Sequence, residues 1–197
     1  MSEKSEVLKV YNFCKGKKID MLVNNAGFGV FGRFSENDME KELEMINVNI
    51  TAVHMLMKLF LREFRERDRG IILNVASSAA YLTGPLMAAY YASKSYVLKL
   101  SAAVAEELRR EGSRVKISVL CPGPVDTEFN NRAGVSFSMK PISAEYAAEC
   151  GIKAALSGKL IAIPGLMIKL GSYGAKMLPH SLVARVTYKM QERKKGV

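Results

Sequence analysis

The sequence predicts an α/β fold built on a doubly wound parallel sheet. Four short apolar runs alternate with longer amphipathic stretches along the 197 residues. Short apolar runs are typical of strands buried on both faces of a sheet, and helices between successive strands impose parallel pairing through crossover connections. We therefore expect a single domain over residues 1–197. Residues 166–197 form a basic, helical C-terminal extension of that domain.

The predicted strands are rich in Ile, Leu and Val. They cover residues 19–23, 71–75, 115–120 and 160–163.

The clearest predicted helix covers residues 38–65, where apolar residues recur in steps of three and four. This stripe comprises Met39, Leu43, Ile46, Ile50, Val53, Met57, Phe60 and Phe64. A second apolar stripe comprises Val48, Ala52, Met55 and Leu59. Asn37 and Glu40 fit a capping box at the start of the helix. One stripe can cover the sheet, and the other needs a cover of its own. We expect a partner subunit to cover it, and therefore a homo-oligomer. The alternative is a second layer of the same chain.

Four further helices are expected after the second strand. Residues 88–110 end near Gly112 with basic residues in the last turn, and residues 144–157 form a shorter helix. Residues 168–178 and 181–195 follow the last strand and are separated at Pro179.

Composition excludes several classes of protein. Hydrophobic residues make up 49% of the chain, without low-complexity runs, which is typical of a globular domain. The polar N-terminus is unlike a signal peptide, and no apolar run reaches the roughly 18 residues that span a bilayer. Three widely spaced cysteines argue against disulfides and against a zinc site, so we expect a cytoplasmic protein without metal.

The net charge of +10 is concentrated near the C-terminus. Eight of the 29 Lys and Arg residues, but only one of the 19 acids, lie from Lys159 onward. Such a tail is most often a solvated face, and a membrane surface is the alternative. Nucleic-acid binding is not expected, because no motif that reads bases accompanies the charge.

Three predicted strands end in polar or Gly/Pro-rich turns. The turns are Asn24-Asn25-Ala26-Gly27, Ala76-Ser77-Ser78 and the segment 121–127. Because the carboxyl ends of parallel strands meet at one edge of the sheet, these turns should line a ligand crevice.

Tyr90 and Lys94 lie four residues apart on a predicted helix, so their side chains share a face. A nearby ammonium favours the phenolate and should lower the tyrosine pKa from about 10 toward the working range. Ser77 could hydrogen-bond a substrate oxygen beside Tyr90, whereas Tyr91 is rotated further from Lys94. A lone Tyr-x-x-x-Lys pair is usually an exposed helix face, and here the inference depends on the order of all the motifs together.

At these motifs the chain resembles the short-chain dehydrogenase/reductase family. The matching residues are Asn24-Asn25-Ala26-Gly27, Asn49, Ser77, Tyr90-x-x-x-Lys94 and Pro122-Gly123 followed by Thr127. The resemblance covers residues 6–165, and the spacing of Ser77 from Tyr90 favours Ser77 over Ser78. It implies a Rossmann-like fold and an oxidoreductase that interconverts carbonyls and alcohols with NAD or NADP. The C-terminal segment also resembles a branch containing many uncharacterised bacterial oxidoreductases.

The resemblance implies a role for each matching residue. Tyr90 would be the general acid/base, Ser77 would position the substrate oxygen, and Lys94 would hold the nicotinamide ribose. Asn49 would distort the long helix and hold a water that leads to Lys94. The implied cofactor-binding residues are Asn24, Ala26, Gly27, Tyr90, Lys94, Gly123, Val125 and Thr127. A loop at about 129–139 would close over a small carbonyl or alcohol substrate, which the hydrophobic C-terminal segment suggests is apolar.

The family's Gly-rich cofactor turn, which precedes the Asn-Asn-Ala-Gly motif by roughly 60 residues, has no counterpart here. Gly27-x-Gly29-x-x-Gly32 fits the dinucleotide pattern, but the next helix opens only near Asp38. We therefore expect an N-terminally truncated domain, either a fragment or a reading frame begun at an internal methionine. The strand at 19–23 should then be an edge strand, and the chain should bind cofactor poorly.

Three functions remain open on the sequence. The first is the oxidoreductase, and the second is a non-catalytic or partner-dependent chain that cannot hold cofactor alone. The third is weak membrane-surface contact through Leu182, Val183, Val186 and Met190 together with the neighbouring basic residues. The alternative to the third function is that this helix only covers the sheet or the mouth of the active site.

Overall fold

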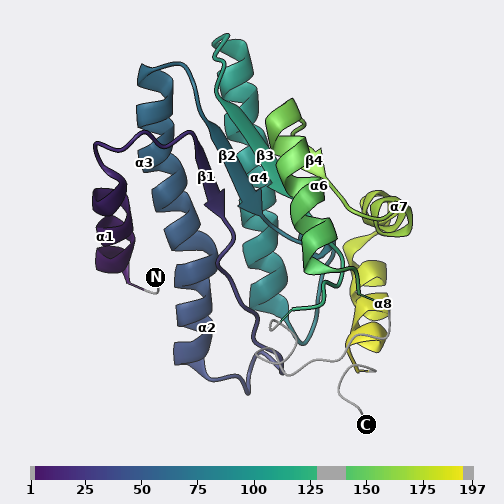
Figure 1. Cartoon of the computed structure of the whole chain (residues 1–197). Coiled ribbons are helices and arrows are strands. Elements are labelled where there is room, and N and C mark those ends of the chain that lie inside the picture. Colours follow the sequence, from purple (N-terminus) through teal and green to yellow (C-terminus); the bar gives the residue numbers. More distant parts are fainter. Residues whose placement is uncertain (1–2, 128–140, 193–197) are drawn as a thin grey trace.

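The computed structural model describes residues 3–127 and 141–192. Its centre is a parallel four-stranded sheet with the order β1-β2-β3-β4. The strands are β1 (Met21–Asn24), β2 (Ile71–Val75), β3 (Lys116–Leu120) and β4 (Ile161–Ala162). All four predicted strands are therefore confirmed, and so is the α/β fold (Figure 1).

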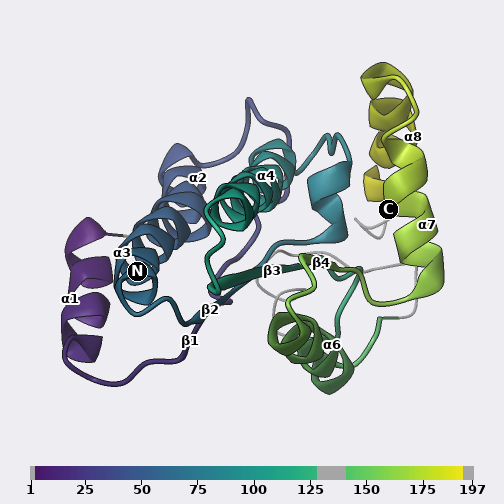
Figure 2. The same cartoon turned by 90° about the horizontal axis from the view of Figure 1, so that it is seen from above.

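Helices cover both faces of the sheet (Figure 2). One face carries α3 (Val53–Glu66) and α4 (Ala88–Arg110), with α1 (Lys4–Cys14) and α2 (Met39–Ile46) on the same side. The other face carries α6 (Ala144–Ser157). Beyond β4 lie α7 (Leu166–Ala175) and α8 (His180–Glu192). None of the helices within residues 3–127 and 141–192 has the length and hydrophobicity that a membrane span requires.

The first strand lies at an edge of the sheet, as predicted. Within the described residues β1 pairs only with β2, and Val23 is 44% exposed. Its neighbour β2, by contrast, is buried at Ile72, Leu73 and Asn74. A strand as apolar as β1 is suited to the interior of a sheet, so this edge presents an unpaired backbone and an apolar side chain.

A π-helical segment, Asn47–Ala52, joins α2 to α3 and changes which residues face the core. A π-helical turn contains an extra residue, so it rotates the helix face. Val53, Met57, Phe60 and Phe64 are buried as predicted. The prediction is wrong before the π turn, where Met39 and Leu43 are exposed and Met45 is buried in their place.

The cap of this helix also differs from the prediction. The N-cap is Asp38, whose side chain accepts hydrogen bonds from the backbone N–H groups of Glu40 and Lys41. The side chain of Asn37 instead donates to Glu42. The carboxylate of Asp38 is as good a cap as Asn37, and it lies one residue closer to the first turn.

Helix α1 was not predicted, because it has a single buried residue, Val7. It packs on α3, where the rings of Tyr11 and Phe60 meet edge to face with centroids 5.5 Å apart. The phenol of Tyr11 also donates a hydrogen bond to Glu63. Both contacts depend on tertiary packing, which the local sequence pattern does not reveal.

A buried polar network ties the sheet to α4. The side chain of Asn24 donates to Asn74, and Asn74 donates to the hydroxyl of Ser101, both over 2.8 Å. Ser101 in turn donates to the carbonyl of Val97. Because these groups are shielded from water, each hydrogen bond is needed to offset the cost of burying its partners.

We predict that Asn74→Ala lowers the free energy of unfolding by about 2 kcal/mol, because it leaves the amide of Asn24 and the hydroxyl of Ser101 without their shared partner. Urea unfolding followed by circular dichroism would measure the loss. Asn12→Ala, an exposed change on α1, should stay within about 0.5 kcal/mol of the parent chain. Equal stabilities of the two variants would contradict the role assigned to the network.

Candidate active site

The π-helical turn places Asn49 in the interior, 1% exposed, against the loop that follows β1. Its amide nitrogen donates to the carbonyl of Phe28 and to the hydroxyl of Ser93, and its oxygen accepts from the backbone N–H of Phe28. The expected distortion of the long helix is therefore present at Asn49. Its side chain fixes the loop after β1 to α4, and the water relay to Lys94 stays a prediction.

Gly27 sits where a larger residue would not fit. A Cβ atom at this position would lie 2.9 Å from Oδ1 of Asn49 and 3.2 Å from Nζ of Lys94. The first distance is shorter than real Cβ contacts, and both groups are held by other bonds. The absence of a side chain therefore lets the loop after β1 approach both residues closely.

Lys94 is buried on α4, 5% exposed, and reaches the carboxyl end of β2. Its ammonium donates a 3.0 Å hydrogen bond to the carbonyl of Val75, the last residue of that strand. The same nitrogen lies 5.8 Å from the centre of the Tyr90 ring. The predicted pair thus shares one face of α4 and points to the predicted edge of the sheet.

Ser77 and Tyr90 come together at this edge. Ser77 caps the 3-10 turn Ser78–Tyr81, where its hydroxyl accepts from the backbone N–H of Ala79. A side-chain hydrogen bond joins Ser77 to the buried phenol of Tyr90. The backbone N–H of Ser78 donates to the carbonyl of Pro122, which brings the turn after β3 to the same place.

Burial dominates the protonation of this site. It raises the pKa of Tyr90 to about 12, although the hydrogen bond with Ser77 opposes the rise. Burial also lowers the pKa of Lys94 to about 8. The expected lowering of the Tyr90 pKa by Lys94 is therefore not found in this structure, where the ammonium bonds to a backbone carbonyl and desolvation is the larger effect.

The remaining predicted cofactor residues are spread around the same edge. The side-chain amide of Asn24 already donates to Asn74, and Ala26 lies in the loop that Gly27 allows to approach Asn49.

The turn after β3 carries the other three predicted residues. A Cβ atom on Gly123 would lie 3.0 Å from the side chain of Ile168. Val125 forms a bridge with Ile142, and Thr127 is the last described residue of this turn. The predicted loop at 129–139 lies outside the described residues.

The glycine pattern 27–32 does not lead into a helix. Helix α2 begins at Met39, and the carboxylate of Asp38 already bonds the free N–H groups of its first turn. A helix N-terminus binds phosphate through such N–H groups, and a carboxylate there would repel an anion. The structure therefore gives this pattern no helix N-terminus for a pyrophosphate.

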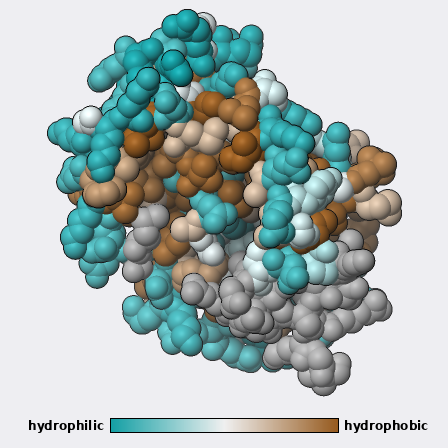
Figure 3. Space-filling model, in the orientation of Figure 1, coloured by the Kyte–Doolittle hydropathy of each residue, from teal (hydrophilic) through white to brown (hydrophobic). Residues whose placement is uncertain are grey.

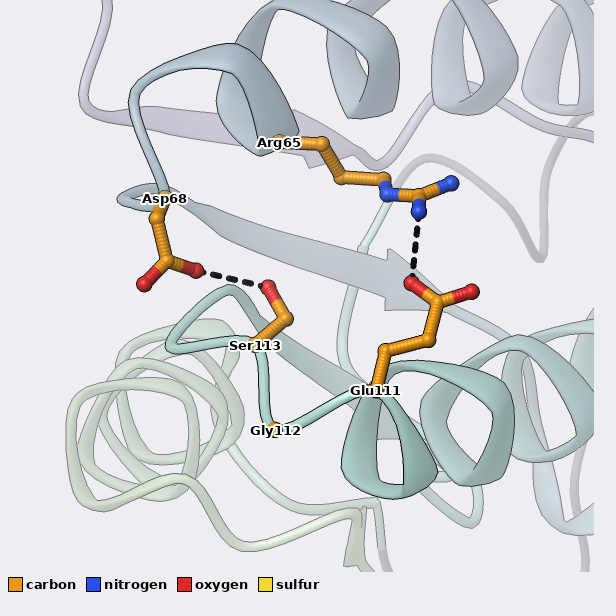
Figure 4. A pocket seen from close by; sticks show the side chains of 5 residues that line it. All are labelled: Arg65, Asp68, Glu111, Gly112 and Ser113. Carbon is orange, nitrogen blue, oxygen red and sulfur yellow. Dashed lines mark hydrogen bonds and ion pairs between the residues drawn. The ribbon is translucent and has the colours of Figure 1, made fainter.

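A hollow of about 280 Å³ lies at the opposite, amino end of β2 and β3 (Figure 4). Its charged groups are already paired, because Arg65 and Glu111 lie 2.6 Å apart and Asp68 lies 3.0 Å from Arg114. Ser113 also donates to Asp68. Ligands of parallel sheets bind beyond the carboxyl ends, and the charges here are mutually paired, so this hollow is not the candidate site.

Sequence reasoning missed Gln191, which joins α8 to the candidate site. Its amide nitrogen donates to the phenol of Tyr91 over 2.7 Å, and the ring of Tyr91 meets that of Tyr90 edge to face. The hydroxyl of Thr187 donates to the carbonyl of Thr83 on the same side. No local pattern signals a contact between residues 100 positions apart, although the polar residues Thr187 and Gln191 in steps of four on an apolar helix are a hint.

Comparisons with known proteins agree on one family. A family model described as short chain dehydrogenase matches residues 1–135. The chain is 38% identical over 104 residues to "Inactive 2-(S)-hydroxypropyl-CoM dehydrogenase 2" of Xanthobacter autotrophicus, covering 53% of this chain and 44% of that protein. It is 30% identical over 180 residues to human 17-beta-hydroxysteroid dehydrogenase type 3, covering 84% and 57%. The chain thus spans about half the length of these curated relatives.

Solved structures share the fold. A short-chain dehydrogenase from Sphingobium yanoikuyae in complex with NADPH superposes with a TM-score of 0.78 at 24% identity. The superposition covers 89% of this chain and 70% of that one.

The buried ammonium gives the candidate site a pH signature. Because the folded-state pKa of Lys94 is lowered to about 8 from 10.5, the unfolded chain binds this proton more tightly, and stability should rise with pH between these values. From pH 7 to pH 9 we expect the parent chain to gain about 1 kcal/mol relative to Lys94→Met. Urea unfolding at both pH values measures this. The control, Lys99→Met, removes an exposed lysine of the same helix and should keep the pH dependence of the parent chain. If Lys94→Met also kept that pH dependence, the burial of a charged amine would be refuted.

Proposed function

The chain belongs to the short-chain dehydrogenase family, and we propose on that premise that it interconverts a carbonyl and an alcohol with a nicotinamide cofactor. The observation that carries the proposal is the hydrogen bond between Ser77 and Tyr90 at the carboxyl edge of the sheet, with Lys94 one helical turn away. An arrangement of two hydroxyls facing one point can hold a single substrate oxygen.

In the reducing direction, the hydroxyls of Ser77 and Tyr90 both donate hydrogen bonds to the substrate carbonyl. The nicotinamide, when bound, supplies the hydride to the carbonyl carbon. As negative charge develops on the oxygen, Tyr90 transfers its proton to it. The raised pKa of Tyr90 keeps the phenol protonated at neutral pH, which is the form that carbonyl reduction requires.

Lys94 acts on the phenolate that this proton transfer leaves. With a pKa of about 8, its amine is mostly charged at neutral pH, and it lies on the same helix face as Tyr90. A buried ammonium stabilises a nearby phenolate more strongly than it would in water. Asn49 and Gly27 are positioning residues in this scheme, because they hold the loop that packs against Lys94.

The described residues would hold the two ends of a dinucleotide. Lys94 and the turn of Gly123, Val125 and Thr127 would meet the nicotinamide end. The loop of Ala26 and Gly27 would line the adenosine side. For the pyrophosphate, residues 3–127 and 141–192 offer no Gly-rich turn that opens a helix.

The substrate that we propose is an apolar ketone or secondary alcohol. The human relative's name denotes a steroid dehydrogenase, and a steroid is an apolar ring system with a ketone or hydroxyl. The aromatic pair Tyr90 and Tyr91 beside Met87 provides apolar surface next to the proposed reacting oxygen.

Tyr90→Phe removes the proposed proton donor and should lower kcat/KM for ketone reduction by about 10²–10⁴-fold. The test uses the 197-residue chain with millimolar NADH or NADPH and a panel of apolar ketones, followed by the nicotinamide absorbance. Tyr91→Phe removes the neighbouring hydroxyl and should change the rate less than about tenfold. Equal effects of the two substitutions would overturn the assignment of Tyr90.

A second candidate function is a chain that completes its cofactor site only with a partner. It is favoured by the exposed edge strand β1 and by Asp38 at the helix start that follows the glycine pattern. In this case the isolated chain keeps the Ser77, Tyr90 and Lys94 groups but lacks turnover.

The two candidates separate on cofactor binding. If the pyrophosphate half is not held, NADH and reduced nicotinamide mononucleotide should bind the isolated chain with dissociation constants within about threefold of each other. Fluorescence titration measures both. An NADH dissociation constant below about 10 μM, with much weaker mononucleotide binding, would exclude the partner-dependent function.

A further inference from the structure

Half of the exposed large apolar side chains among the described residues lie on α7, on α8 and in the turn between them. Among the described residues, twenty such side chains are exposed, and ten of them fall between Leu166 and Met190. They are Leu166, Met167, Leu170, Tyr173, Met177, Leu178, Leu182, Val186, Tyr188 and Met190. In both views α7 and α8 lie together at the end of the molecule farthest from α1 (Figures 1 and 2). Exposed apolar side chains gathered in this way mark a binding surface.

Helix α7 is apolar on two opposite sides. Its inner side carries the buried Ser172 and the partly buried Ile168 and Ala175. At 100° per residue, Leu166 and Leu170 point away from that side, and they are 71% and 59% exposed. Brown surface is visible where α7 lies, at the right of Figure 3. A helix that had only to cover the sheet would carry polar residues on this outer side.

Helix α8 divides into three adjacent stripes. Val183, Thr187 and Gln191 are buried against the protein. This corrects the sequence-based grouping, which placed Val183 on the outer surface with Leu182, Val186 and Met190. The latter three are 43–51% exposed and form the next stripe.

The third stripe of α8 is basic, with Arg185 and Lys189 both exposed. On α7, Lys169 is also exposed. The ammonium of Lys176, in the turn after α7, instead lies 4.9 Å from the ring centre of the buried Tyr81. Against the three outward cations, residues 166–192 contain a single acid, Glu192. Apolar stripes flanked by cations are typical of helices that lie in the interface of an anionic membrane.

We propose that the outer side of α7 and α8 binds the surface of an anionic lipid bilayer. The apolar side chains would enter the headgroup region, and the lysines and arginine would meet lipid phosphates. A second copy of the chain fits this surface less well, because a symmetric contact would bring the same cations face to face. The interaction does not require the proposed enzymatic activity.

The test is sedimentation of the 197-residue chain with vesicles of phosphatidylcholine alone or with phosphatidylglycerol added. We expect binding to the anionic vesicles at least about fivefold above the neutral ones, and a several-fold loss when salt is raised to about 0.5 M. Lys169→Glu with Lys189→Glu should reduce binding by about tenfold or more, because each cation near the surface contributes roughly fivefold. Both lysines are exposed, so the chain should stay folded, which circular dichroism would verify.

Leu166→Ser with Leu170→Ser should also reduce binding, and this loss should persist at low salt because it removes apolar burial. The matched controls are Lys41→Glu with Lys99→Glu for charge, and Ile152→Ser with Leu156→Ser for apolar exposure on α6. Neither control should change binding.

The proposal is overturned if the chain binds anionic vesicles no better than neutral ones, or if the controls weaken binding as much as the α7 and α8 changes. It is equally overturned if the chain forms a dimer in sedimentation velocity that Leu166→Ser with Leu170→Ser dissociates, without vesicle binding.

Discussion

The convergence of Gly27, Asn49 and Lys94 is the constraint on which the candidate site depends. Three elements meet there: the loop after β1, the π-helical turn before α3, and α4. The contact is possible because Gly27 has no side chain and because the π turn directs Asn49 inward. There the side-chain amide of Asn49 donates to the carbonyl of Phe28 and accepts from its N–H group. With the loop fixed in this way, Lys94 is enclosed, and its ammonium is directed to the end of β2 beside Tyr90.

The same enclosure sets the chemistry of the site. Desolvation acts in opposite directions on its two titratable groups, raising the pKa of the phenol and lowering that of the amine. Both shifts favour the neutral forms, so the protonated phenol and the charged amine coexist only up to about pH 8. In the proposed carbonyl reduction, the oxygen that gains negative charge would meet a protonated phenol and an ammonium that donates to a backbone carbonyl. The free energy spent on burying Lys94 is thereby available to stabilise a phenolate.

The sequence predicted the elements whose cause is local, and it failed where the cause is tertiary. Buried parallel strands are continuous apolar runs, so all four were found, and α4 and α6 have clear periodicity and end signals. The meeting of Ser77 with Tyr90 and Lys94 could be predicted, because the carboxyl ends of parallel strands lie at one edge of the sheet. The π turn could not be predicted from hydrophobic spacing, since its extra residue shifts the buried face from Met39 and Leu43 to Met45. Gln191 was missed for a related reason, because its partner Tyr91 lies in a different part of the chain.

Helix α8 shows how the missed contact bears on the rest of the molecule. Its inner stripe is polar at Thr187 and Gln191, whose side chains donate to the carbonyl of Thr83 and to the phenol of Tyr91. A helix that is held by such specific hydrogen bonds keeps one rotational setting, because turning it would bury unpaired groups. That rotational setting also fixes the direction of the other two stripes of α8. Leu182 and Lys189 therefore face outward because Gln191 is bonded to Tyr91 on the inner side. The outer surface of α8 and its contact with Tyr91 are therefore two sides of one rigid element.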